Sequence, residues 1–315
     1  MYSLIRRLLF LLDPEDAHDF IARQMVALQQ IPIVLRAIER ACAPPASALR
    51  ELFGLTFRSP IGIAAGFDKN ATMMPFLAAL GFGFVEVGTV TLHPQPGNPR
   101  PRMFRYPESH AIVNRMGFNN DGADAVAERL ARWQKTVPLF VNVGKNRDVA
   151  LDAAPEAYAA CAAKLAKYAD VLVTNVSSPN TPSLRELQRP EHLTAILDAV
   201  STTKPLLVKI APDVDDVLLS EICDVCVKRA SGMICTNTAA HPDGGLSGAP
   251  LKARSTEVLA RVRGHVGAGF PLIGVGGVFT PEDVRSKMAA GADLVQLYTG
   301  FIYEGPALPS RLARA

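Results

Sequence analysis

Residues 138–177 read "PLFVNVGKNRDVALDAAPEAYAACAAKLAKYADVLVTNVS", a short apolar run, a helical pattern and a second short apolar run. The two runs, 138–144 and 171–177, are nearly continuous in apolar residues rather than alternating with polar ones, which indicates parallel strands buried on both faces. The pattern between them opens with Pro followed by Glu, the usual signature of a helix N-terminus. This stretch therefore predicts one strand–helix–strand unit with parallel strands.

The same unit recurs along the rest of the chain. Six further apolar runs predict strands at 61–66, 85–91, 206–211, 232–237, 271–277 and 294–300. Helical patterns lie at 71–80, 123–133, 190–200, 215–229, 252–262 and 281–290. Eight strands alternating with helices predict an α/β fold, the (β/α)8 TIM barrel. A doubly wound sheet is the alternative, but the GxGxxG that would follow its first strand is missing.

Two segments lie outside the eight units. One is a helical head, residues 1–45, and the other is a long insertion after the second strand, residues 92–120. The sequence of the head predicts two short helices. Much of their surface is apolar, with basic residues at the edge of that surface, as in helices that lie in a membrane interface. A helical cap on the barrel or a dimer contact is the alternative, and this stretch alone favours it. We expect a head at 1–45 and a barrel at 46–315.

The composition limits the classes of protein and the compartment. The chain has 315 residues, 49% of them hydrophobic, and a formal net charge of +3, which is too balanced to indicate a nucleic-acid partner. The apolar run near the N-terminus is too short for a secretory signal or a membrane span. Five cysteines without an export signal favour the reduced cytoplasm. The C-x-x-C at Cys223 and Cys226 lies inside a helical pattern, so we interpret it as core packing.

In a TIM barrel the residues at the carboxyl ends of the strands form the active site. Here that edge collects amides, hydroxyls, glycines and two lysines: Gly66, Asp68, Lys69, Thr89, Asn142, Asn175, Ser177, Ser178, Lys209, Thr236, Asn237, Thr238, Gly276, Gly277, Tyr298 and Thr299. No paired carboxylates are present for glycoside hydrolysis, and no His, Asp or Glu cluster is present for a metal. Ser178 has no histidine beside it that would make a catalytic triad.

Neutral hydrogen-bonding groups with two lysines fit a planar heterocycle that bears an anion. The segments "GVGGV" and "YTG" follow the seventh and eighth strands, where such barrels bind a phosphate. A flavin that carries a phosphate would use both halves of the site, with Lys209 stabilising the reduced ring. Simpler roles stay open for single residues, since Lys69 could pair with Asp68 and Lys209 could be a satisfied core lysine.

A series of motifs matches one family in order and spacing. The segments are "AAGFDKN", "VEVGTVT", "PQPGNPRPRMFR", "NRMGFNN", "NVGKN", "NVSSPNTP", "VKIAPD", "CTNT", "GGLSGAPL", "GVGGV" and "QLYTGF". With them the whole chain resembles the quinone-dependent (class 2) dihydroorotate dehydrogenases. The resemblance implies an FMN-binding TIM barrel with an N-terminal helical extension that oxidises dihydroorotate to orotate in pyrimidine biosynthesis.

The resemblance also implies a role for individual residues. The FMN contacts would be Ala65, Gly66, Phe67, Asp68, Lys69, Thr89, Asn142, Asn175, Lys209, Thr236, Gly248, Gly277, Tyr298 and Thr299. The dihydroorotate contacts would be Lys69, Asn114, Arg115, Met116, Gly117, Phe118, Asn175, Asn180, Asn237 and Thr238. Ser178 would be the catalytic base, and His18, Arg105 and Tyr298 would line the quinone site.

Ser178 and the head together indicate the quinone-dependent class, because the soluble class uses cysteine as its base and lacks the head. By this resemblance the head admits a membrane-dissolved quinone, and we expect a peripheral membrane protein on the cytoplasmic face of a bacterial inner membrane. Three rivals remain at this point: another FMN barrel that reduces a pyrimidine ring, a flavin-free phosphosugar isomerase or lyase, and a catalytically silent membrane-associated binding protein. The first would use cysteine, the second needs a carboxylate or histidine base, and intact Ser178 and Lys69 argue against the third.

Overall fold

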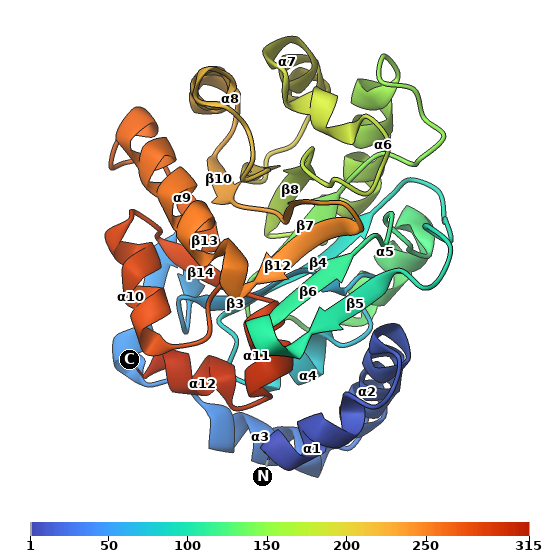
Figure 1. Ribbon diagram of the computed structural model, residues 1–315, viewed down its shortest axis with the longest axis vertical. Coiled ribbons are helices and arrows are strands. Elements are labelled where there is room, and N and C mark those ends of the chain that lie inside the picture. The colour runs from blue at the N-terminus through green and yellow to red at the C-terminus, as the bar shows by residue number, and fades with distance from the viewer. Residues whose placement is uncertain (1, 315) are drawn as a thin grey trace.

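The protein is described by a computed structural model, which covers residues 2–314, and its centre is a closed barrel of eight parallel strands (Figure 1). Each strand pairs with the next along the chain, and the last pairs with the first. The strands are β3 Ile61–Asp68, β4 Phe84–Val90, β7 Leu139–Val143, β8 Val171–Asn175, β9 Leu206–Ile210, β10 Gly232–Cys235, β13 Leu272–Val275 and β14 Leu294–Leu297. All eight predicted strands and the predicted TIM barrel are therefore confirmed.

Within residues 2–314, helices surround the barrel; the seven that precede the last strand lie at the predicted positions, and the two that follow it were not predicted. They are α4 Met74–Ala79, α5 Gly122–Arg132, α6 Ala154–Leu165, α7 Pro190–Ala199, α8 Asp216–Arg229, α9 Lys252–Val266, α10 Pro281–Ala289, α11 Thr299–Glu304 and α12 Leu308–Ala313. Several have proline at the first or second helical position, and α10 also has a capping box formed by Thr280 and Asp283. Cys223 and Cys226 are buried in the core from α8, as their pattern predicted.

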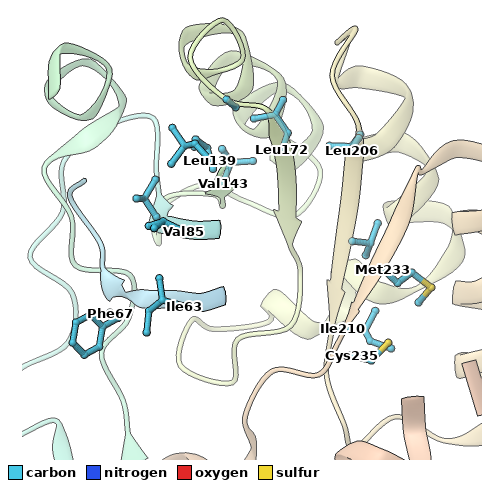
Figure 2. Close-up of a cluster of buried hydrophobic side chains, with 14 of the residues drawn as sticks. Ile63, Phe67, Val85, Leu139, Val143, Leu172, Leu206, Ile210, Met233 and Cys235 are labelled. Carbon is cyan, nitrogen blue, oxygen red and sulfur yellow. The ribbon is translucent and has the colours of Figure 1, made fainter. Parts of the chain in front are cut away.

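Within residues 2–314 the barrel has two main hydrophobic layers, and a third cluster around Ile112 and Tyr303 lies outside them. The larger lies between the strands and the helices, where Leu139, Leu172 and Leu206 extend from neighbouring strands (Figure 2). The smaller fills the barrel, and its Phe84 and Phe140 rings have their centroids 4.7 Å apart. A hairpin that the sequence did not predict, β1 Arg50–Leu52 and β2 Leu55–Phe57, adds a third aromatic ring to this inner layer. The filled interior leaves the strand ends as the place for a site.

The head consists of three helices, one more than the sequence predicted. They are α1 Tyr2–Leu9, α2 Pro14–Leu28 and α3 Pro32–Cys42, and they lie along one end of the barrel near α4, α11 and α12 (Figure 1). Large apolar side chains on the head are exposed, among them Leu4, Leu8, Leu11, Phe20 and Ile33. Within residues 2–314, none of the helices combines the length and the apolar character needed to cross a bilayer.

The long insertion is not a bare loop, contrary to the sequence-based expectation. It contains β5 Met103–Tyr106 and β6 Ala111–Asn114, which join β11 Ala239–His241 and β12 Gly244–Gly248 in an antiparallel sheet of order β11-β12-β6-β5. These strands are too short to show a period in the sequence, and β6 pairs with β12 from more than 120 residues away. The sheet places Asn114 opposite Gly245, at the mouth of the barrel.

Candidate active site

A cavity opens at the carboxyl ends of the barrel strands and encloses about 1010 Å³ of space not filled by protein atoms, including the part that opens to solvent. Most of the residues predicted for cofactor, substrate and catalysis line it: Ala65, Gly66, Lys69, Thr89, Asn114, Met116, Gly117, Phe118, Asn175, Ser178, Asn180, Lys209, Thr236, Asn237, Thr238, Gly248, Gly277, Tyr298 and Thr299. The fold thus brings together residues from all parts of the chain between β3 and β14.

Four predicted site residues do not line this cavity. The carboxylate of Asp68 turns away and accepts the backbone N–H groups of Thr72 and Met73, at 2.8 and 2.7 Å. Its role is to hold the turn before α4, so it does not pair with Lys69 as one alternative supposed. Phe67 extends to a different cavity, described below.

The other two are Arg115 and Asn142. The exposed Arg115 guanidinium donates to the carbonyl of Pro101 and lies over the Phe104 ring, so it packs the insertion rather than the cavity. Asn142 is fully buried beneath the wall, where its Oδ1 accepts the Thr89 hydroxyl at 2.6 Å. Asn142 therefore orients a lining residue instead of lining the cavity itself.

A network of amides and hydroxyls fixes the end of β8. Asn175 Nδ2 donates to Thr89 Oγ1 at 2.8 Å, and Asn175 Oδ1 accepts the Ser177 hydroxyl at 3.1 Å. Asn237 Nδ2 in turn donates to Ser177 Oγ at 2.9 Å. Because these side chains restrain one another, the amides are held in place before any ligand binds.

Ser178 follows directly in the chain and is 6% exposed. Its Oγ accepts the backbone N–H of Asn180 at 3.2 Å, and no other hydrogen bond to this oxygen forms within residues 2–314. Asn180 Nδ2 donates to Asn114 Oδ1 at 3.1 Å, which ties this loop to β6. The loop therefore presents a hydroxyl with free hydrogen-bonding capacity into the cavity.

Two buried polar residues at the cavity, Glu86 and Gln296, are missing from the sequence-based prediction. Glu86 on β4 is fully buried and accepts Asn142 Nδ2 at 2.6 Å and Gln296 Nε2 at 2.5 Å. Lys209 Nζ lies 3.7 Å from Glu86 Oε2, so this lysine has a counter-ion inside the barrel. The signal for Glu86 in the sequence was that it is the single charged residue within an otherwise apolar buried strand, "FVEVGTV".

Lys69 lies at the cavity wall with less solvent around it than a surface lysine. Burial lowers the pKa of its ammonium to about 8, and the Glu15 carboxylate on α2 acts in the opposite direction. No carboxylate of residues 2–314 lies within ion-pair distance of Lys69. Its ammonium is consequently available to an anionic ligand.

The far end of the cavity is built from backbone. Gly276 and Gly277 have φ values of +107° and +70°, which favour glycine. A Cβ on Gly277 would lie 2.5 Å from the Cα of Lys252. The loop can therefore pack closely on the start of α9 only with glycine at this position. Successive N–H groups in such a turn suit an anion such as phosphate.

Unsatisfied buried atoms test whether a flavin fits here. Gln296 Oε1 and Asn180 Oδ1 are buried, and both residues line the cavity. Neither atom has a hydrogen-bond partner among residues 2–314. Buried polar atoms are nearly always hydrogen-bonded, so these two call for a ligand with matching donors. A planar, polar-edged ring with a phosphate therefore fits the wall that the residues form.

A second cavity lies between the head and the barrel and encloses about 1140 Å³, including space open to solvent. Its wall is mainly apolar, and it includes all three residues predicted for the quinone site, His18, Arg105 and Tyr298. Burial lowers the pKa of His18 to about 3, so its imidazole is neutral near pH 7. Tyr298 lines both cavities, and its ring lies 6.1 Å from that of Phe67.

Comparison with known proteins gives one consistent result. The family model described as dihydroorotate dehydrogenase matches residues 48–315. A protein of Salinispora arenicola named dihydroorotate dehydrogenase (quinone) is 48% identical, over 96% of this chain and 94% of its own length. One of Mycobacterium marinum with the same name is also 48% identical, over 97% of this chain and 89% of its own.

Solved structures agree with this result. The crystal structure of the Eimeria tenella DHODH in complex with ferulenol superposes with a TM-score of 0.87 at 35% identity, covering 97% of this chain and 93% of that one. The ligand-free structure from the same organism gives a TM-score of 0.85 at 36% identity, covering 96% and 93%. The chain therefore belongs to the dihydroorotate dehydrogenase family.

Proposed function

We propose that the cavity at the barrel mouth binds FMN and dihydroorotate together, with Ser178 as the base that starts the reaction. As a member of its family the chain is a flavin-dependent oxidoreductase that oxidises dihydroorotate to orotate in pyrimidine biosynthesis. One observation carries the proposal: a buried hydroxyl, a set of fixed amides and a free ammonium line one cavity. Neither a metal nor an imidazole base is required by this arrangement.

The proposed FMN contacts divide between the two ends of the cavity. Lys209 and Asn175 would hold the ring, while Gly248, Gly277 and Thr299 would hold the phosphate. When bound, FMN supplies the acceptor for the hydride that leaves C6 of dihydroorotate. The remaining proposed contacts are Ala65, Gly66, Lys69, Thr89, Thr236 and Tyr298.

The chain's own residues would handle the substrate and its proton. Lys69 would bind the dihydroorotate carboxylate, and Asn175, Asn180 and Asn237 would bind the amide groups of the ring. The Ser178 hydroxyl would accept the proton from C5, which is acidified by the adjacent carbonyl, and would release its own proton to solvent through the open side of the cavity. Asn114 and the segment Met116–Phe118 would cover the substrate from the insertion.

We also propose that the second cavity admits a membrane quinone. Its apolar wall suits the quinone, and Tyr298 separates it from the first cavity. Residues 1–45 would form this access extension and residues 46–315 the FMN-binding barrel. The exposed leucines of the head would rest on the lipid surface of a bacterial inner membrane, on its cytoplasmic face.

A flavin spectrum tests the proposal directly. We expect the purified protein to be yellow and to lose its flavin absorbance when dihydroorotate is added without oxygen. Quinone should restore the absorbance, whereas fumarate and NAD should not. A protein that binds no flavin, or a bound flavin that dihydroorotate leaves oxidised, would contradict the proposal.

A further inference from the structure

A buried lysine on α10 has no role in the function proposed above. Lys287 is 1% exposed, and its Nζ donates a 2.6 Å hydrogen bond to Ser255 Oγ on α9. The nearby carboxylate, Asp283, is bound instead by Lys252 at 2.6 Å. Within residues 2–314 no carboxylate lies within ion-pair distance of Lys287. Burial lowers the pKa of the Lys287 ammonium to about 7, so the group is buried at a cost and is held by this single strong hydrogen bond.

Ser255 connects Lys287 to the wall of the cavity by hydrogen bonds. Ser255 is fully buried, and its Oγ lies 3.1 Å from the carbonyl oxygens of both Gly276 and Lys252, which share its single hydroxyl hydrogen. The approach depends on glycine, because a Cβ on Gly276 would lie 2.7 Å from Ser255 Oγ. In Figure 1, α9 and α10 lie side by side next to β13, the strand that leads into this loop. Lys287, Ser255 and Gly276 thus form a hydrogen-bonded chain from α10 to the cavity wall.

The last member of this series of hydrogen-bonded groups is the peptide unit between Gly276 and Gly277. The carbonyl of Gly276 and the N–H of Gly277 belong to the same peptide unit. A hydrogen bond to the carbonyl polarises that unit and makes its N–H a stronger donor. The Gly277 N–H has no acceptor within residues 2–314, and both glycines line the cavity.

The cationic side chains that line the cavity do not come from the Gly276–Gly277 loop, so a polarised N–H has a role at this end. The two lysines on the wall, Lys69 and Lys209, come from β3 and β9, whereas the Gly276–Gly277 loop follows β13. No lining residue within the loop region carries a cationic side chain. An anion at this end would therefore depend on backbone donors and on the groups that polarise these donors from behind.

We infer that Lys287 is a positioning residue for the phosphate of the bound flavin: acting through Ser255, it orients and polarises the Gly276–Gly277 peptide. The inference rests on the proposed FMN site. It adds a residue that touches neither cofactor nor substrate. The Lys287 amino group lies in the layer behind the wall, where its hydrogen bond to Ser255 strengthens a backbone donor without filling space that the cofactor needs.

The test compares two flavins that differ only in the phosphate. The full chain, stripped of flavin, is titrated with FMN and with riboflavin, and binding is followed by the quenching of flavin fluorescence. We expect Lys287→Met to weaken FMN binding about tenfold, which corresponds to about 1.4 kcal/mol, and riboflavin binding by less than about twofold. Ser255→Ala should show the same selective loss, and the double variant should lose no more than either single variant.

A matched control separates the relay from a general loss of positive charge. Lys252→Met removes a lysine that is 46% exposed and pairs with Asp283, and it should leave the ratio of FMN to riboflavin affinity within about twofold of the wild type. A tenfold change in that ratio for Lys252→Met would overturn the relay in favour of bulk charge.

Three further outcomes are decisive. Equal weakening of both flavins in Lys287→Met would make the lysine merely structural and overturn the inference. Unchanged affinities for both flavins in Lys287→Met and Ser255→Ala would overturn it too, while the proposed FMN site would stand. A wild-type chain that binds riboflavin as tightly as FMN would remove the phosphate site itself. Should Lys287→Met fail to fold, the Ser255→Ala titration decides alone.

Discussion

At the scale of single residues, the proposed base is a weak one, a serine hydroxyl whose position is fixed by its loop. Among residues 2–314, the Ser178 hydroxyl accepts only the N–H of Asn180, and it lies in a cavity whose amides are fixed by Thr89 and Ser177. A hydroxyl is a poor base in water, so its use here depends on position and on exclusion of solvent. The chemistry consequently depends on the loop geometry as much as on the serine.

Replacing Ser178 by alanine tests this view. Ser178→Ala should slow reduction of the bound flavin by dihydroorotate by roughly 10²- to 10⁴-fold, the range for loss of a general base, while flavin remains bound. Stopped-flow absorbance measures the rate. Ser177→Ala is the control: Ser177 hydrogen-bonds Asn175 and Asn237 but does not line the cavity, so it should weaken substrate binding more than it slows the step. Normal reduction in Ser178→Ala would place the base elsewhere.

The pKa of Lys69 predicts how the binding of orotate depends on pH. Burial lowers the pKa of its ammonium to about 8, so the positive charge is present below that pH and is lost above it. The dissociation constant for orotate should therefore rise about tenfold per pH unit above about pH 8. A fluorescence titration from pH 6 to pH 10 measures it. Lys69→Arg should remove the slope, since a guanidinium keeps its charge, and a flat wild-type profile would mean that Lys69 does not bind the carboxylate.

At the scale of elements, a buried ion pair attaches α2 to the insertion. Arg102 donates to both carboxylate oxygens of Glu15, with its shortest contact at 2.7 Å, and also to the carbonyls of Pro96 and Asn98. Burial raises the pKa of Glu15 and its hydrogen bonds with Arg102 lower it, with a net shift downward. The head is therefore attached at a defined angle to the insertion that covers the site.

Breaking this pair should destabilise the protein strongly. Arg102→Met leaves the Glu15 carboxylate, 4% exposed, without its main partner, and should lower the free energy of unfolding by about 3–5 kcal/mol. Urea unfolding measures the change. The double variant Glu15→Gln with Arg102→Met should recover much of the loss, because no buried charge remains. Arg100→Ala is the exposed control and should cost less than about 1 kcal/mol; a similar cost for both arginines would contradict the role of burial.

At the scale of the whole molecule, two cavities share one wall. Tyr298 lines both the polar cavity at the barrel mouth and the apolar cavity under the head. The first is built almost wholly from the barrel and its loops, whereas the second includes residues from α1 and α2. The two half-reactions should therefore be separable by changing the head alone.

Removing residues 1–40 should separate them. We expect turnover with quinone to be lost, because the apolar cavity loses one wall, while reduction of the flavin by dihydroorotate continues at a measurable rate. Sedimentation with phospholipid vesicles should show that the truncated chain no longer binds. As a milder control, Leu8→Ser with Leu11→Ser should reduce vesicle binding by roughly tenfold or more without slowing flavin reduction. Equal loss of both half-reactions on truncation would make the head structural.

The sequence alone determined the alternation of strands and helices, and through it most of the site. Apolar runs and helix starts are local signals, and a barrel places every strand end at one mouth, so residues such as Asn175, Ser178 and Lys209 could be assigned to one cavity before any coordinates. Their roles came from the resemblance to a family. The hydroxyl without a histidine was visible in the sequence, but its meaning was not.

Only the tertiary structure decided which polar groups face the cavity and which support it from behind. Glu86 meets Asn142, Gln296 and Lys209 across the barrel, and the sheet β11-β12-β6-β5 joins segments more than 120 residues apart. Asp68 and Arg115 turn away because backbone groups nearby offer them better hydrogen bonds. Such pairings depend on distances between segments that are remote in the chain, and no local period in the sequence encodes those distances.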